Sequence, residues 1–508
     1  MWHPSFKLKI IVLTFLTLPI LSAKADEADE ADTSEQLKKL QQMMQELQQQ
    51  RLEQDKQIEL LTKELVGIEN QVSQVKITKS EEKRSSKGVP IYGAFKDGLV
   101  FEDGTSNWKL QLNGRMQADY RSYQPDGWRN DTFSTRRARL GGTFSFLKDF
   151  TVRVEGEYAN DNIGTRATTA LTYGYLDFTR WPAAKIRVGQ FKPFFGLERP
   201  QSTNFTDFTE LSLATNNGAI FTSTYDRGVM VFGDPLPWLN YNAYLVNGTG
   251  QNNDDVRDSK DIGARVNANF ASITANKDVV LHAGVSASKG SIGFSTAAGN
   301  NVAQSTEGSG VQFFNVSNIS STGSATTVPS TLATSRFTSD RQRLGLETAI
   351  AYGPVKVQAE YINANFEGKR GPTTAGVAFD NDIKVWYADV NWLVTGESYA
   401  DAYKSGVFGR IKPKNNFDDK TGWGAFELGL RYSKFDASDF KALLPAATAT
   451  AAFTSEADAW TAGAKWILNP NARIMLNYVH TNFDNDIRVS GKLDDTEEAA
   501  VLRAQYDF

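Results

Sequence analysis

Basic side chains recur at every second position in several stretches of this chain. In WKLQLNGRMQADY (residues 108–120), Lys109 and Arg115 share one face of a predicted strand, while apolar residues share the other. The basic residues predicted on the polar faces are Lys109, Arg115, Arg121, Arg137, Arg139, Arg153, Lys185, Arg187 and Arg265. Arginine donates two parallel hydrogen bonds to an oxyanion and stays protonated, whereas lysine offers a compact, mobile charge. The pattern therefore favours reversible binding of anions at several moderate sites in series.

Catalytic and metal-binding groups have little support in the sequence. There is no cysteine, and the histidines are His3, His282 and His480. A cysteine nucleophile and a thiolate zinc site are thus excluded, and no local motif marks a serine, histidine and carboxylate set. Acidic clusters such as Asp494–Asp495 lack the spacing of a dedicated cation loop. We predict no enzyme activity, no metal, no cofactor and no binding of nucleic acid.

The strands that must position the basic residues number 16 in our prediction. They lie near residues 108–121, 133–146, 150–159, 169–180, 185–191, 226–233, 239–247, 260–270, 279–289, 341–352, 354–366, 383–394, 422–435, 456–468, 471–484 and 498–508. Short and long connections alternate, the longest being 192–225 and 290–340, while 395–421 is long where a short turn is expected. This layout predicts a transmembrane, all-β fold, a 16-stranded antiparallel outer-membrane β-barrel in contact with lipid, with a water-filled lumen. A soluble sandwich or propeller is disfavoured because a charged face is repeatedly paired with an uninterrupted apolar face.

The N-terminal region predicts export. Lys7 and Lys9 precede an apolar run at residues 10–21, and Ala23-Lys24-Ala25 has the small-x-small pattern of a signal-peptidase site. The run is too short to span a bilayer as a helix. We therefore expect three parts: a signal peptide (1–25), a periplasmic coiled-coil stalk with its linker (26–90) and the barrel (91–508).

A heptad seam predicts the coiled coil. Its apolar positions are Leu37, Leu40, Met44, Leu47, Ile58, Leu61, Leu65, Ile68, Val72 and Val75, with Arg51 and Gln54 interrupting them. Polar residues at such positions fix the register of the helices and the number of helices in the coiled coil. The seam favours self-association, and the alternative is a lone amphipathic helix lying on the barrel or the membrane.

Anion preference cannot come from total charge, because the chain has 55 Lys and Arg against 59 Asp and Glu. It must depend on where cations are placed in a narrow lumen.

Nine segments in order resemble the phosphate-selective porins of the O and P type. They are NGRMQADY (113–120), TRRARLGGTF (135–144), IRVGQFKPFFGLE (186–198), VNGTG (246–250), LHAGVSAS (281–288), VTGES (394–398), GWGAFELGLRYS (422–433), LNPNARIMLNYVHT (468–481) and LRAQYDF (502–508). The resemblance implies a homotrimeric 16-stranded porin in which an arginine ladder guides anions to a constriction containing lysines, with the third long loop folded inward.

The resemblance also assigns individual residues. Arg115, Arg136 and Arg137 look like ladder positions, Arg265 is a weaker match, and Lys384 looks like a constriction lysine. Strict alternation would place one of Arg136 and Arg137 inward and leave the other for a rim or subunit contact. The anion-binding set that we predict is Arg115, Arg136, Arg137, Arg139, Arg265, Lys384 and, from the loop 192–225, Lys192 and Arg199.

One departure affects the expected substrate. Glu210 is followed by Leu211, where similar porins have an arginine, and the same loop carries Asp207. We expect a passive channel for phosphate, polyphosphate, pyrophosphate or other anions. The alternatives are a general diffusion porin with weak anion bias and a structural protein tethered through the coiled coil.

Overall fold

The computed structural model describes residues 38–39, 41–64, 90–96, 98–105, 107–160, 169–255, 259–293, 302–316, 338–370, 377–418, 420–449 and 451–508. The chain divides into two units, residues 1–89 and 90–508. In the first unit, residues 41–64 are helical, and the seam residues Met44, Leu47, Ile58 and Leu61 are each more than half exposed. The predicted signal peptide, the linker up to residue 89 and the other apolar seam positions lie outside the described residues. No described helix is long and apolar enough to cross a membrane.

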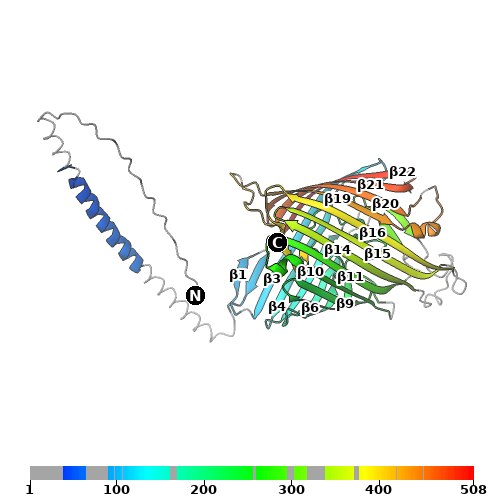
Figure 1. Cartoon of the computed structure of the whole chain (residues 1–508), viewed down its shortest axis with the longest axis horizontal. Helices are drawn as coiled ribbons and strands as arrows, with labels where there is room; N and C mark the ends of the chain where they lie inside the picture. Colours follow the sequence, from blue (N-terminus) through cyan, green and yellow to red (C-terminus); the bar gives the residue numbers. More distant parts are fainter. Residues whose placement is uncertain are drawn as a thin grey trace, which may run out of the picture. The chain divides into compact units, whose positions relative to one another are not determined.

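The second unit is a closed antiparallel barrel (Figure 1). Its 16 described strands are β3 (Trp108–Gln124), β4 (Thr132–Phe146), β5 (Phe150–Asn160), β6 (Ala170–Phe178), β7 (Lys185–Phe191), β8 (Asp226–Leu236), β9 (Leu239–Val246), β10 (Asp261–Asn269), β11 (Val279–Gly293), β14 (Thr338–Tyr352), β15 (Val355–Arg370), β16 (Val377–Leu393), β19 (Ala425–Asp436), β20 (Glu456–Asn469), β21 (Ala472–Val489) and β22 (Lys492–Asp507). Each pairs with its sequence neighbour, and β22 pairs with β3 to close the sheet. The prediction of 16 strands is confirmed.

Shorter elements decorate the barrel. The hairpin of β1 (Tyr92–Phe95) and β2 (Leu99–Glu102) pairs with the start of β3. A second hairpin, β12 (Val302–Ser305) and β13 (Gln312–Val316), belongs to the connection between β11 and β14. The connection between β16 and β19 contains α2 (Tyr399–Ala402) and the hairpin of β17 (Tyr403–Lys404) and β18 (Val407–Phe408), and the 3-10 helices span Phe270–Thr274 and Ser438–Leu443.

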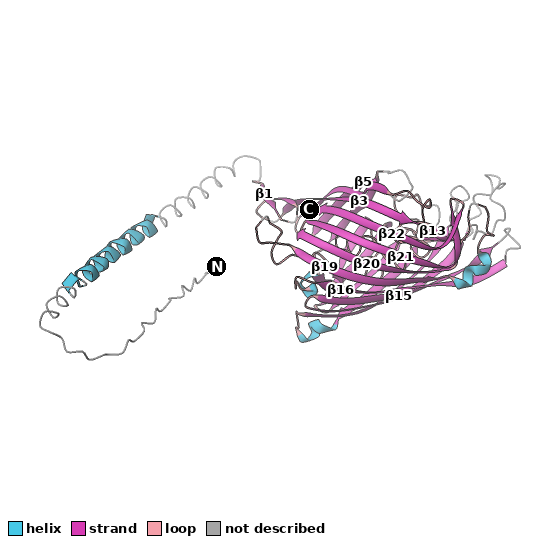
Figure 2. Ribbon diagram, turned by 90° about the horizontal axis from the view of Figure 1, so that it is seen from above, coloured by secondary structure: helices cyan, strands magenta, loops and turns pink. Residues whose placement is uncertain are grey.

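The strands cross the barrel obliquely (Figure 2). Along each strand, residues alternate between two environments. In β16, Val385 and Tyr387 are fully buried, whereas Trp386 and Val390 between and beyond them are exposed on the outer face. Some strands are longer than predicted: β16 begins at residue 377 rather than 383, and β22 at 492 rather than 498. The reason is that backbone pairing continues beyond the predicted alternation, through polar stretches such as residues 380–382.

The connection between β7 and β8, residues 192–225, folds into the lumen, and we call it the constriction loop. Its Phe195, Leu213 and Phe221 are at most 4% exposed and share one apolar cluster with wall residues such as Val385 and Phe435. Burial of each such side chain contributes about 1.5–3 kcal/mol. The loop is therefore docked against the inner wall of the barrel.

Candidate functional site

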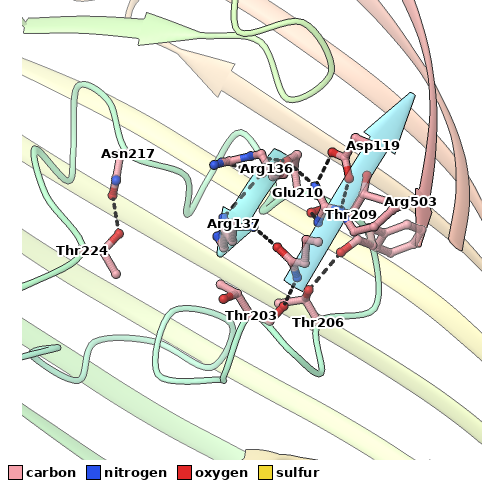
Figure 3. Close-up of polar contacts among 12 residues, drawn as sticks. Asp119, Arg136, Arg137, Thr203, Thr206, Thr209, Glu210, Asn217, Thr224 and Arg503 are labelled. Carbon is pink, nitrogen blue, oxygen red and sulfur yellow. Dashed lines mark hydrogen bonds and ion pairs between the residues drawn. The ribbon is translucent and has the colours of Figure 1, made fainter. Parts of the chain in front are cut away.

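Glu210 of the constriction loop is surrounded by arginines from three strands (Figure 3). Its carboxylate lies 2.6 Å from Arg121 Nη2 of β3, 2.9 Å from Arg136 Nε of β4 and 2.9 Å from Arg503 Nη2 of β22. Arg137 Nη2 is 3.9 Å away. Burial raises the pKa of Glu210, but these guanidiniums outweigh it and hold the pKa well below its usual range. Glu210 is therefore ionised, and it ties the loop to the wall.

The other acidic residues of the loop also face the wall. Glu198 Oε1 lies 3.2 Å from Arg431 Nη1 of β19, and Asp207 lies 2.6 Å from Lys356 Nζ of β15. Arg431 further contacts Glu307, beside β12, at 2.6 Å. The negative charge of the loop is thus paired against the barrel, so Asp207 does not act as a free anion in the lumen.

A β-bulge places both Arg136 and Arg137 on the lumen side. Arg137 pairs with Gln117, whereas the next pair along the ladder is Thr135 with Ala118, so Arg136 is an extra residue. A bulge locally disrupts alternation and can re-aim a side chain. The expectation that one of the two arginines would point away, to a rim or subunit contact, was wrong: both reach Glu210, and Arg137 Nη1 also donates to Gln117 Oε1 at 2.9 Å.

Two cavities lie between the constriction loop and the wall formed by β3 to β7. The first, about 350 Å³, lies toward the long loops and is lined by Arg136, Arg137, Arg199, Glu210 and Leu211, among others. The second, about 630 Å³, lies toward the chain terminus and reaches Arg410 and Phe508. Arg139, Lys192, Thr203 and Tyr225 line both cavities, so they mark the boundary between them.

Three cations at these cavities have no ion-pair partner among the described residues. Arg115 contacts the Thr203 hydroxyl, Lys192 Nζ donates to the Gln201 carbonyl at 2.9 Å, and Arg199 donates to the carbonyls of Thr215 and Ser223 at 2.6 and 2.8 Å. Hydroxyl and carbonyl oxygens position these cations without neutralising them. Burial, together with the neighbouring Arg199, Arg139, Arg115 and Arg137, lowers the pKa of Lys192 well below its usual range. The basic side chains at the two cavities therefore lie close enough to one another to interact electrostatically.

The remaining predicted residues behave differently. Arg139 lines both cavities but is paired with Glu157 at 2.5 Å. Arg265 is buried in an ion pair with Glu347 at 2.7 Å and donates to the Gly406 carbonyl, which makes it a contact of the long turn between β16 and β19. The prediction for Lys384 was wrong, because this residue is exposed on the outer face beside Trp386. Ile383 and Val385 are the fully buried neighbours, so Lys384 is one position out of phase with the lumen.

The lumen arginines that the sequence reasoning missed include Arg431 and Arg503. Arg431 and Arg503 are each 1% exposed and hold the constriction loop, yet they lie inside GWGAFELGLRYS and LRAQYDF, two segments quoted only for their resemblance. The alternation Glu427, Arg431, Ser433 could have placed Arg431 on the inner face. The described residues contain no cluster of three or more potential metal ligands.

Comparison with known proteins agrees with this architecture. The family model "Phosphate-selective porin O and P" matches residues 110–508. Porin O of Pseudomonas aeruginosa is 27% identical over 454 residues, which cover 84% of this chain and 94% of that protein. Among solved structures, OmpT of Vibrio cholerae gives a TM-score of 0.46 at 10% identity, covering 79% of this chain and 98% of that one. The outer membrane channel DcaP of Acinetobacter baumannii gives 0.45 at 12% identity, with the same coverage.

The match extends over most of the chain and coincides with the closed barrel and its constricted lumen. The chain therefore belongs to the phosphate-selective porin O and P family and is an outer-membrane porin, a channel rather than an enzyme.

Proposed function

We propose that this porin is an anion-selective channel that passes phosphate or a related oxyanion, such as pyrophosphate or polyphosphate, across the outer membrane. The observation that carries the proposal is the set of cations lining the two cavities, Arg115, Lys192 and Arg199, which no described carboxylate pairs. A permeating anion replaces part of its hydration shell with their N–H donors. Because three separate cations share this task, each step is weak enough to allow release.

The paired arginines support the same path in another way. Arg136, Arg137, Arg121 and Arg503 surround Glu210 and Asp119, which leaves an excess of positive charge in that cluster. The anchored loop also keeps the opening narrow, so that the cations act at short range in a region of low dielectric.

The extent of pairing favours one alternative, a general diffusion porin with weak anion bias. Arg139 and Arg153 lie beside Glu157 and Glu155, and these carboxylates reduce the field along that wall. The two candidates differ in whether the channel has a binding site for phosphate or only a general preference for anions over cations.

The deciding experiment measures the purified protein in a planar bilayer. The reversal potential across a chloride gradient reports the sign of selectivity, and titration with phosphate and then polyphosphate reports a site. Anion preference with chloride current blocked by low phosphate supports the proposal, and block by polyphosphate alone moves the substrate to the longer anion. Unblocked current with weak anion preference favours the general porin, and cation preference contradicts both.

We further propose that the chain is exported through the predicted signal peptide and assembles as a homotrimer. The support for assembly is the exposed heptad seam of the helix at 41–64, where Met44, Leu47, Ile58 and Leu61 form a stripe that a partner helix would cover. The structural role of this stalk does not require that it take part in conduction.

A further inference from the structure

The larger cavity, on the side of the chain terminus, has an unusual lining for a path that handles only inorganic anions. Besides its cations it is lined by Tyr173, Tyr175, Phe194, Phe205, Tyr225 and Phe408. Its volume is about 630 Å³, whereas a cavity of about 150 Å³ already accommodates benzene. The space and the lining both fit an organic solute.

Three of these rings form a continuous surface, which we call the aromatic wall: Tyr225, Tyr173 and Tyr175, with Arg153 and Arg187 stacked on it. The ring centroids of Tyr225 and Tyr173 are 4.9 Å apart, and those of Tyr173 and Tyr175 are 5.8 Å apart, both edge to face. The guanidinium of Arg153 lies 4.3 Å from the Tyr173 centroid, and that of Arg187 lies 3.8 Å from the Tyr175 centroid.

The arginines of the aromatic wall are already neutralised at their edges. Arg153 Nη2 lies 2.7 Å from Glu155, and Arg187 donates through Nε and Nη2 to the two oxygens of Asp177 at 2.7 and 2.8 Å. The aromatic wall therefore carries little net charge, and its rings are what it presents to a solute. The face of an aromatic ring carries a negative quadrupole, which does not attract an oxyanion but does favour an edge-to-face contact with another ring.

Basic side chains without a carboxylate partner among the described residues line the same cavity, namely Arg115 and Lys192. One cavity thus combines unpaired basic side chains with the aromatic wall. We propose that the channel takes organic anions that carry a planar aromatic ring, the anionic group binding at Arg115 and Lys192 and the ring lying along the aromatic wall. This inference rests on the proposed anion selectivity and extends it to a class of substrate.

The competing interpretation is that the tyrosines serve to hold Arg153 and Arg187 in place. The two interpretations predict different behaviour toward ligands of equal charge. If the rings contact the solute, benzoate blocks the chloride current at concentrations at least fivefold lower than acetate, and cyclohexanecarboxylate, which is similar in size but not planar, resembles acetate. If the rings only position arginines, benzoate, cyclohexanecarboxylate and acetate block the chloride current at similar concentrations.

Variants of the full chain in planar bilayers separate these outcomes. Tyr173→Leu and Tyr175→Leu are each expected to lose the preference for benzoate while the reversal potential in chloride stays unchanged, and Tyr173→Phe is expected to keep both. Tyr352→Leu is the matched control, because Tyr352 is 70% exposed on the outer face.

Equal block by benzoate and acetate in the wild-type anion channel would overturn this inference and leave the proposed function intact. A benzoate preference that persists in both leucine variants would also overturn it, as would leucine variants that lose chloride selectivity together with benzoate block. Cation preference of the wild-type protein would overturn the proposed function and this inference with it.

Discussion

Arg503 Nη2 lies 2.9 Å from Glu210 Oε1, and this contact joins the last strand of the barrel to the constriction loop. Arg503 also lies 2.7 Å from Asp119, which in turn is paired with Arg121, so strands β3 and β22 hold the loop at the point where the barrel closes. The anchor of the loop and the closure of the barrel are therefore one network.

The first prediction concerns Glu210→Gln. The substitution removes the charge that four arginines surround, and removing one partner of a buried ion pair costs about 3–5 kcal/mol. We expect a loosened loop with larger single-channel conductance, and a stronger anion preference because the arginines lose their counter-charge. Conductance and reversal potential in a chloride gradient measure both effects.

The control for this change is Glu498→Gln on the outer surface, where the side chain is 44% exposed and lies near His480. It should leave both measurements as in the wild type. Unchanged conductance combined with a weaker anion preference in Glu210→Gln would contradict the anchoring role.

The second prediction compares two lysines. Lys192→Gln removes an unpaired cation at the boundary of the cavities and is expected to weaken phosphate block about tenfold, which is about 1.4 kcal/mol. Lys384→Gln is the same chemical change on the outer face and should leave block unchanged. Titration of the chloride current with phosphate gives both values, and an effect of Lys384→Gln as large as that of Lys192→Gln would return Lys384 to the pore.

The third prediction is a dependence on pH. Because the pKa of Lys192 is lowered, its ammonium loses the proton at a lower pH than an ordinary lysine does. Anion preference should therefore decline as pH rises, starting below the range in which exposed lysines titrate. The reversal potential measured over a pH series tests this.

Lys192→Arg should keep the preference to higher pH, because a guanidinium stays protonated. Lys192→Met should show a lower preference without this step. A step that remains in Lys192→Met would assign the titration to another group.

The period-2 pattern was sufficient to predict the barrel because lipid and water impose it on every strand. Two residue assignments were wrong, each for its own reason. At Arg136 a bulge adds one residue, and bulges leave no mark in a simple alternation. At Lys384 the assignment followed the resemblance, although the alternation with the buried residues Ile383 and Val385 places Lys384 on the outer face.

The anchoring contacts of the constriction loop could not be predicted in the same way. Arg503 and Glu210 are 293 positions apart, and nothing in either local sequence specifies the other as a partner. Their pairing depends on closure of the barrel and on how the apolar residues Phe195 and Leu213 dock the loop. The sequence pattern placed Arg115 and Arg139 on the lumen face, and only the fold showed that Arg139 is paired with a carboxylate while Arg115 is not.

The fourth prediction concerns the stalk. In the helix at 41–64, Leu47 and Ile58 of the seam are each more than 60% exposed. Such an apolar stripe is removed from water when a partner helix packs against it. Deleting residues 33–76 should leave conductance and ion selectivity unchanged, because the basic residues that we propose to select anions all belong to the barrel unit, while the oligomer should dissociate at a lower temperature. Bilayer recordings and the melting of the oligomer on gels measure the two properties separately. A truncated protein that forms normal trimers but has lost its ion selectivity would show that the stalk takes part in conduction.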